Sequence, residues 1–170
     1  MMDDFRQDYR RYRETGHGLA DMLFSRGFQA VVSYRLRHWM HARHIPFIHV
    51  VIGYLTEVVT AVEIPANVKI GKGLVIYHGG PVTINGSACL GERIGLRPGV
   101  VIGSNNEGDG APTLGNNVDV GVGAKLIGNI EVGENSKIGA NAVVTKSFPQ
   151  NSVLVGIPAR NIAKDPGTPV

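Results

Sequence analysis

The sequence is poor in cysteine, in charge and in long apolar runs, and each shortage excludes a class of protein. Its single cysteine, Cys89, rules out a disulfide framework. We interpret it as a small core residue, with a reactive thiol as the alternative. The start of the chain lacks the pattern of a secretory signal, so a cytoplasmic setting is expected. Only 18% of the residues are charged, and no Lys/Arg cluster with interleaved aromatics occurs, so nucleic acid is not an expected partner.

The most apolar stretch, residues 45–62, is unsuited to crossing a membrane. A spanning helix needs about 20 predominantly apolar residues in a row. This stretch is interrupted by four residues: Pro46, His49, Gly53 and Glu57.

The first sixty residues are predicted to be helical. Between Leu19 and Met40, apolar residues recur at spacings of three and four, with arginines between them. We expect the helices to pack against the rest of the chain or against a neighbouring subunit. The alternative is a peripheral contact with a membrane surface, because the helices are basic and carry Trp39. No cysteine or carboxylate completes a ligand set close to the histidines of this region, so no metal site is predicted: His38, His41, His44 and His49.

From Ile64 to Val144 the chain carries a repeat of six residues. Aliphatic guide residues recur at that spacing with two interruptions: Ile64, Ile70, Ile76, Ile84, Leu90, Leu96, Ile102, Leu114, Val120, Leu126, Val132, Ile138 and Val144. Four positions after most of them stands a second apolar or small residue: Val68, Leu74, Ala88, Ile94, Val100, Val118, Ala124, Ile130, Ser136 and Ala142. Glycine often follows the guide residue, which suits tight turns.

Each repeat is therefore predicted to be one short strand followed by a corner. A single strand of this kind cannot bury its apolar face, whereas stacked coils form a continuous core and pair the strand edges. The alternatives are another kind of solenoid or a β-sandwich, but sandwich strands recur at about 8 to 12 residues. The spacing leaves the hand of the coil open.

The repeat fails at two places, and we expect chemistry there because extra residues leave the coil. The first is the segment from Ile76 to Pro81, which holds the only histidine of the repeat region, His78. Its imidazole could take a proton from a hydroxyl during acyl transfer, and a turn histidine in solvent is the alternative. The second is the polar segment 104–113, predicted to be a protruding loop that lines a binding cleft or is a tolerated insertion.

Several motifs follow one another along the coil: Glu63-Ile64-Pro65, Ile70 to His78, Gly95 to Gly103, Ile127 to Gly133, Lys137 to Val144, and Val155 to Arg160. Over residues 60–163 they resemble the serine acetyltransferase branch of the hexapeptide-repeat acyltransferases. The short helical start and the pattern around His78 and Arg97 resemble most the acetyltransferases of bacterial surface polysaccharides, of the colanic acid type.

The resemblance implies a left-handed parallel β-helix, acetyl-CoA as the acetyl donor without a metal, and a homotrimer with active sites between subunits. It places His78 at the catalytic histidine, as general base, with Glu63 as a carboxylate that could orient it. Three residues are candidates for binding the acceptor: Tyr77, Arg97 and Asn105. The positions matching the family's coenzyme groove and its phosphate end are Gly103, Ser104, Val122, Gly123, Ala140, Lys146 and Arg160.

The chain also departs from serine acetyltransferases. Tyr77 stands where the family has Asp before the catalytic histidine, and Ala111 stands where a second histidine is expected. We therefore expect transfer of acetyl to a sugar hydroxyl in exopolysaccharide or capsule biosynthesis, with serine O-acetylation as the alternative. A γ-type carbonic anhydrase would need three histidines around zinc, and a non-catalytic structural coil is the remaining alternative.

The expected organisation has three parts. Residues 1–60 form a helical N-terminal region, and residues 61–163 form the β-helical acyltransferase domain with the loop 104–113. Residues 164–170 form a C-terminal tail, whose Pro/Gly composition is typical of a disordered end.

Overall fold

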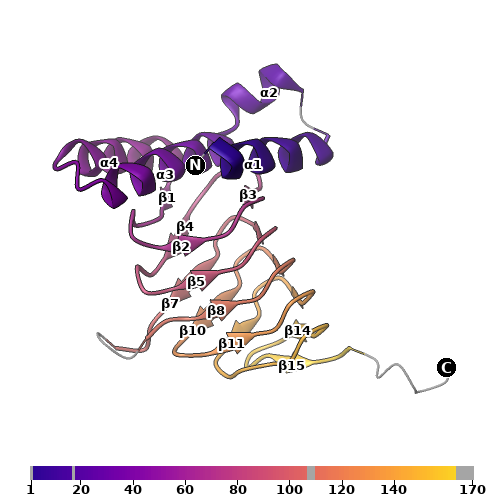
Figure 1. Cartoon of the computed structure of the whole chain (residues 1–170). Coiled ribbons are helices and arrows are strands. Elements are labelled where there is room, and N and C mark those ends of the chain that lie inside the picture. The colour runs from indigo at the N-terminus through magenta and orange to yellow at the C-terminus, as the bar shows by residue number, and fades with distance from the viewer. Residues whose placement is uncertain (1, 17, 107–109, 164–170) are drawn as a thin grey trace.

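The computed structural model describes residues 2–16, 18–106 and 110–163. A three-sided coil of short strands extends away from a layer of helices that covers its first turn (Figure 1). The chain visits three sheets in rotation, so each described strand except the last pairs in parallel with a strand one coil earlier or later, and the last strand pairs antiparallel. This is the predicted left-handed parallel β-helix.

The three sheets form the three faces of the coil. Sheet 1 consists of β1 (Val62–Glu63), β4 (Val82–Ile84), β7 (Val101–Gly103), β10 (Lys125–Ile127) and β13 (Val143–Val144). Sheet 2 consists of β2 (Lys69–Ile70), β5 (Cys89–Leu90), β8 (Thr113–Leu114) and β11 (Glu131–Val132). Sheet 3 consists of β3 (Val75–Ile76), β6 (Gly95–Leu96), β9 (Asp119–Val120), β12 (Lys137–Ile138), β14 (Val153–Val155) and β15 (Arg160–Asn161).

Every guide residue of the repeat is buried, as predicted, and so is every residue of the second set. The guide residues stack along the axis, because the register pairs each one with its equivalent in the next coil, as in Ile84 with Ile102 and Leu96 with Val120. Ser136 is the polar exception among these two sets, and its hydroxyl donates to the carbonyl of Gly133 at 2.7 Å. The repeat thus specifies both the core and the register.

The interpretation of Cys89 as a core residue is wrong. Cys89 is exposed, because it precedes the guide residue Leu90 in β5 and successive side chains of a strand point to opposite faces. Its side chain therefore lies on the outer surface of sheet 2.

The N-terminal region folds into four helices. They are α1 (Met2–Glu14), α2 (Leu19–Phe24), α3 (Arg26–Ala42) and α4 (Ile48–Thr60). The helical pattern from Leu19 to Met40 is divided at Ser25, whose side chain accepts a hydrogen bond from the backbone of Phe28 and caps α3. None of the helices in the described part of the chain is long and apolar enough to span a membrane.

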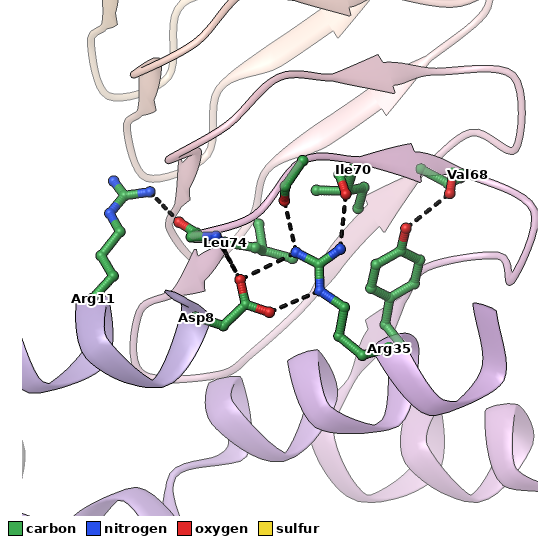
Figure 2. A network of polar contacts seen from close by, with 9 residues as sticks. Asp8, Arg11, Arg35, Val68, Ile70 and Leu74 are labelled. Atoms are coloured by element: carbon green, nitrogen blue, oxygen red, sulfur yellow. Dashed lines mark hydrogen bonds and ion pairs between the residues drawn. The ribbon is translucent and has the colours of Figure 1, made fainter. Parts of the chain in front are cut away.

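Helices α1 and α3 are joined to the first coil by a buried polar network (Figure 2). Arg35 of α3 donates to the Asp8 carboxylate of α1 and to the carbonyls of Ile70 and Gly71. Asp8 in turn accepts from the backbone N–H groups of Gly73 and Leu74. The helical layer is therefore held in one position relative to the coil.

Helix α4 presents its apolar side to the surface. Its small and polar side faces α3, where Thr56 shares a hydrogen bond with Ser33 and Gly53 contacts the side chain of Arg37. The exposed apolar residues recur at helical spacing: Ile48, Val50, Val51, Tyr54, Leu55, Val58 and Val59. A contiguous apolar face of this kind is typical of an interaction surface.

Candidate active site

His78 lies in the corner between β3 and β4, where the first coil carries its extra residues. The backbone N–H of Gly79 donates to the carbonyl of Tyr77 at 2.8 Å, which closes a three-residue turn centred on His78. His78 has a φ of 64°, a conformation that costs energy for a residue with a Cβ atom. Strain of this kind concentrates at functional sites. The turn leaves the imidazole exposed.

Hydrogen bonds to the end of α4 and to the second coil hold this corner in place. The N–H of Gly80 donates to the carbonyl of Thr60 at the end of α4. On the other side of the corner, the N–H of Gly99 donates to the carbonyl of Pro81 at 2.6 Å. The corner that carries His78 is thus fixed by the helical layer and by the second coil.

The corners between sheet 3 and sheet 1 stack into one edge of the coil, which we call the His78 edge. Below His78, the edge continues through Pro98, whose carbonyl accepts from the N–H of Gly123 at 2.9 Å. One coil further, the N–H of Asn141 donates to the carbonyl of Val122 at 2.7 Å. The predicted coenzyme-groove residues Val122, Gly123 and Ala140 therefore share one edge with His78.

Other predicted residues lie at the opposite border of sheet 1, between sheets 1 and 2, which we call the loop edge. Gly103 ends β7, and the hydroxyl of Ser104 accepts a hydrogen bond from Asn85 at 3.2 Å. Asn105 lies beside Gly128 of the next coil, and Lys146 follows β13. Residues 107–109 of the predicted loop, like the tail 164–170, lie outside the described residues. In a single chain, sheet 1 separates the loop edge from the His78 edge.

Ala111 and Arg160 occupy two further positions. Ala111 is buried, so its side chain offers no group to a substrate. Arg160 is exposed in β15, which pairs antiparallel with β14 at the C-terminal end of the coil. Arg160 is thus far along the axis from His78, at the end of the coil where the last strands lie.

A cluster of charged and aromatic side chains lies on sheet 3 beside Tyr77. The guanidinium of Arg97 lies 4.8 Å from the centre of the Tyr77 ring and donates to Asp119 at 2.8 Å. Arg11 reaches the same place from α1 and donates to the carbonyls of Gly73 and Ile94. Burial lowers the pKa of Arg11, while the nearby Tyr77 opposes that shift.

Sequence reasoning missed Asp119 and Arg11 as members of this cluster. Asp119 sits in an ordinary repeat position, immediately before a guide residue, and nothing in the spacing marks it. Arg11 lies more than sixty positions from Tyr77 in the chain, and only the docking of α1 brings it there. A long-range contact of this kind has no local signal.

Glu63 lies in β1, opposite Thr83 of β4, and its side chain is exposed. It lines a pocket of about 120 Å³ together with Arg37 and Glu57. Arg37 donates to the carbonyl of Ile64 at 2.8 Å, and burial lowers its pKa. Within the described residues Glu63 makes no hydrogen bond to His78, so its orienting role stays a prediction.

A larger cavity, of about 600 Å³, lies elsewhere. It is a largely apolar cavity between α1, α3 and α4, lined by residues that include Phe5, Val32 and Leu55. It contains none of the predicted site residues. Within the described parts of the chain there is also no group of three or more His, Cys, Asp or Glu that could hold a metal ion.

Comparisons with known proteins identify the family. Residues 111–146 match the model described as "Bacterial transferase hexapeptide (six repeats)". A serine acetyltransferase of Helicobacter pylori is 42% identical over 146 residues, which cover 85% of each chain. The chain belongs to the serine acetyltransferase family of hexapeptide-repeat transferases.

Further members show how far the likeness extends. A serine acetyltransferase of Synechococcus elongatus is 40% identical over 94% of this chain, which spans only 66% of that relative. The crystal structure of Neisseria gonorrhoeae serine acetyltransferase in complex with serine superposes with a TM-score of 0.88 at 27% identity. It covers 95% of this chain and 69% of the other. The predicted acyltransferase class and fold are confirmed by this membership.

The prediction of a sugar acceptor in polysaccharide biosynthesis is wrong. It rested on the departures at Tyr77 and Ala111 and on the pattern around His78 and Arg97 with the short helical start. The likeness to proteins named serine acetyltransferase extends over most of the chain. The comparisons favour the alternative, serine. The physical lesson is that single side chains in an acceptor site can be exchanged while the surrounding scaffold is kept.

Proposed function

We propose that the protein transfers the acetyl group of acetyl-CoA to the hydroxyl of serine. The observation that carries this proposal is the 42% identity over 85% of the Helicobacter pylori serine acetyltransferase, with an exposed histidine at the strained corner of the first coil. The superposition with a serine-bound member supports the same acceptor.

His78 acts as the general base in this proposal. Its imidazole takes the proton of the serine hydroxyl as that oxygen attacks the thioester carbonyl of acetyl-CoA. Backbone N–H groups stabilise the oxyanion of the tetrahedral intermediate. When the carbon–sulfur bond breaks, the imidazolium returns the proton to the departing CoA thiolate. Glu63 orients the imidazole in the same scheme, which Glu63→Gln would test through turnover.

The coenzyme lies along the His78 edge in this proposal. Val122, Gly123 and Ala140 offer backbone and small side chains there, which suits a narrow pantetheine arm. Lys146 and Arg160 are exposed cations at the far end of the coil and would bind the phosphates. Tyr77 and Arg97 line the acceptor side, beside His78.

We further propose a homotrimer, with residues 61–163 as its catalytic unit and the helices of residues 1–60 as its cap. The reason is geometric. Gly103, Ser104 and Asn105 lie on the loop edge, and His78 lies on the other border of sheet 1. A neighbouring copy that brings its loop edge to the His78 edge would complete the site. Co-expression of His78→Ala with Ser104→Trp tests this: two individually inactive chains recover activity only if sites are shared.

The activity is tested by the release of free CoA from acetyl-CoA by purified protein. We expect turnover with serine and none with a panel of sugars, nucleotide sugars and oligosaccharides. Equal background rates with all acceptors would contradict the proposal. A His78→Ala preparation serves as the control for non-enzymatic hydrolysis.

Peripheral membrane contact through the helices stays a prediction. The exposed apolar face of α4 is the surface that would carry it. Sedimentation with anionic and with neutral vesicles tests the prediction, and Leu55→Glu with Val59→Glu would abolish binding if α4 is the contact.

A further inference from the structure

Serine presents a carboxylate to its enzyme, and that charge needs a cation near the base that activates the hydroxyl. The hydroxyl and the carboxylate of serine are separated by only two carbon atoms, so the cation must lie close to His78. The position at which the resemblance leads us to expect a second histidine is Ala111, which is buried and cannot bind an anion. Another residue of this chain must therefore supply the charge.

Three arginines lie around the corner that carries His78, and two of them are already engaged. Arg97 is paired with Asp119 at 2.8 Å and lies over the Tyr77 ring. Arg11 donates to two backbone carbonyls, those of Gly73 and Ile94, and is partly buried. Backbone carbonyls thus occupy the N–H donors of Arg11, and Asp119 neutralises the charge of Arg97.

Arg26 is the third arginine, and its guanidinium is unengaged. It is exposed, and it makes no side-chain hydrogen bond or ion pair within the described residues. A Cβ atom placed on Gly79 would lie 2.5 Å from Cβ and 3.4 Å from Cδ of Arg26. The stem of Arg26 therefore runs along the backbone of the residue that follows His78.

The position of Arg26 on α3 adds to its suitability. It is the first residue of this 17-residue helix, after the cap Ser25. Helix α3 approaches the corner so closely that a Cβ atom on Gly27 would lie 1.9 Å from the carbonyl oxygen of Ile76. The N-terminal end of α3, where Ser25 caps the N–H of Phe28, also carries partial positive charge.

We propose that Arg26 binds the carboxylate of the acceptor and so determines the preference for an amino acid. This inference rests on the proposed transfer to serine. The carboxylate lies against the guanidinium, and the hydroxyl two carbons away lies at the imidazole of His78. Gly79 is part of the arrangement, because any side chain there would displace the arginine stem and its φ of 77° disfavours one.

The test compares serine with serinamide, which keeps the hydroxyl and the amine but lacks the carboxylate. For the unaltered protein we expect kcat/KM to favour serine by about 10- to 100-fold, the range of a charge-assisted hydrogen bond. Arg26→Met should raise KM for serine by about the same factor and change kcat by less than about twofold. The kcat/KM of this variant for serinamide should stay unchanged, so the preference for serine over serinamide should be lost.

Two further variants make the result specific. Arg26→Lys keeps the charge but not the planar fork, and should recover part of the preference. Arg13→Met removes an exposed arginine of α1 and should leave both acceptors unaffected. KM for acetyl-CoA should be the same in all variants, since the coenzyme lies along the other corners.

The possible failures are distinguishable. If the unaltered protein does not acetylate serine, the proposed function is wrong and the inference is overturned with it. If it acetylates serine and Arg26→Met keeps the full preference over serinamide, the inference alone is overturned. A parallel loss with both acceptors would likewise overturn it, because a merely structural role would slow the two reactions equally.

Discussion

Asp8 and Arg35 form a buried ion pair in which Nε of Arg35 lies 2.7 Å from Oδ2 of Asp8 (Figure 2). The same carboxylate accepts the N–H groups of Gly73 and Leu74 at 2.7 and 2.8 Å. One acidic side chain thereby connects α1, α3 and the coil segment that leads into β3. Since β3 ends immediately before the corner of His78, the pair also supports the candidate active site.

Replacing Asp8 by Ala should destabilise the protein by about 3 to 5 kcal/mol, because Arg35 would remain buried without its counter-ion. Urea unfolding followed by circular dichroism measures the change. Asp3→Ala, on the exposed part of the same helix, is the matched control and should change the free energy of unfolding only slightly. The double variant Asp8→Ala with Arg35→Met should regain part of the loss; no recovery would mean that the charge is not the cause.

Replacing His78 by Ala should lower acetyl transfer by about 10² to 10⁴, the usual contribution of a positioned general base. The side chain is exposed, so its replacement removes no packing contact from the core. The melting temperature should therefore stay unchanged. His44→Ala, an exposed histidine between α3 and α4, is the control. Nearly full activity of the His78 variant would remove this residue from the mechanism.

Replacing Gly27 by Ala should lower both stability and turnover. The new Cβ would lie 1.9 Å from the carbonyl oxygen of Ile76, which is backbone and cannot move aside cheaply. We expect a loss of about 1 to 3 kcal/mol from overpacking and a fall in kcat, because α3 must shift away from the His78 corner. Gly103→Ala, whose Cβ would meet only ordinary contacts at 3.5 Å, is the stability control.

Replacing Ala140 by Trp should raise KM for acetyl-CoA without changing the fold. Ala140 is exposed on the His78 edge, so a large side chain would occupy the proposed groove but would displace no core residue. Initial rates at varied acetyl-CoA concentration measure the effect, and the unfolding midpoint should be unchanged. Lys137→Trp, exposed on sheet 3, is the control. Equal KM values in the two variants would place the coenzyme elsewhere.

The protein should lose stability at alkaline pH through its buried tyrosines. Burial raises the pKa of Tyr34 to about 12 from its ordinary value of 10.0, and its hydroxyl donates to the carbonyl of Val68. Burial also raises the pKa of Tyr12. The folded state therefore holds protons that the unfolded chain releases, so this contribution is complete below pH 10 and is lost as the pH rises to about 12.

Tyrosinate absorbance and unfolding followed together over that range test the alkaline prediction. The buried tyrosines, Tyr12 and Tyr34, should ionise only as the protein unfolds. Tyr34→Phe should flatten the alkaline fall in stability, and Tyr54→Phe should not. Full ionisation of all tyrosines in a folded protein would contradict the account.

The candidate site could be predicted only in part from the sequence. His78 stands out because the repeat fails around it, and the family resemblance assigns Val122, Gly123 and Ala140 to the coenzyme groove. By contrast, the exposure of Cys89 follows from its offset of one position from the guide residue Leu90, because successive side chains of a strand point to opposite faces. The acceptor was predicted wrongly because two substituted side chains outweighed the likeness of the whole scaffold.

By itself, the sequence determined the coil. A six-residue period repeated along the chain fixes which side chains point inward and which coil pairs with which, because both depend only on local spacing. The tertiary structure alone decided what surrounds His78. Arg11 and Arg26 come to the neighbourhood of that corner through the docking of α1 and α3, and the stacking of coils brings Asp119 to Arg97 beside Tyr77. Contacts between segments so distant in the chain leave no periodic trace.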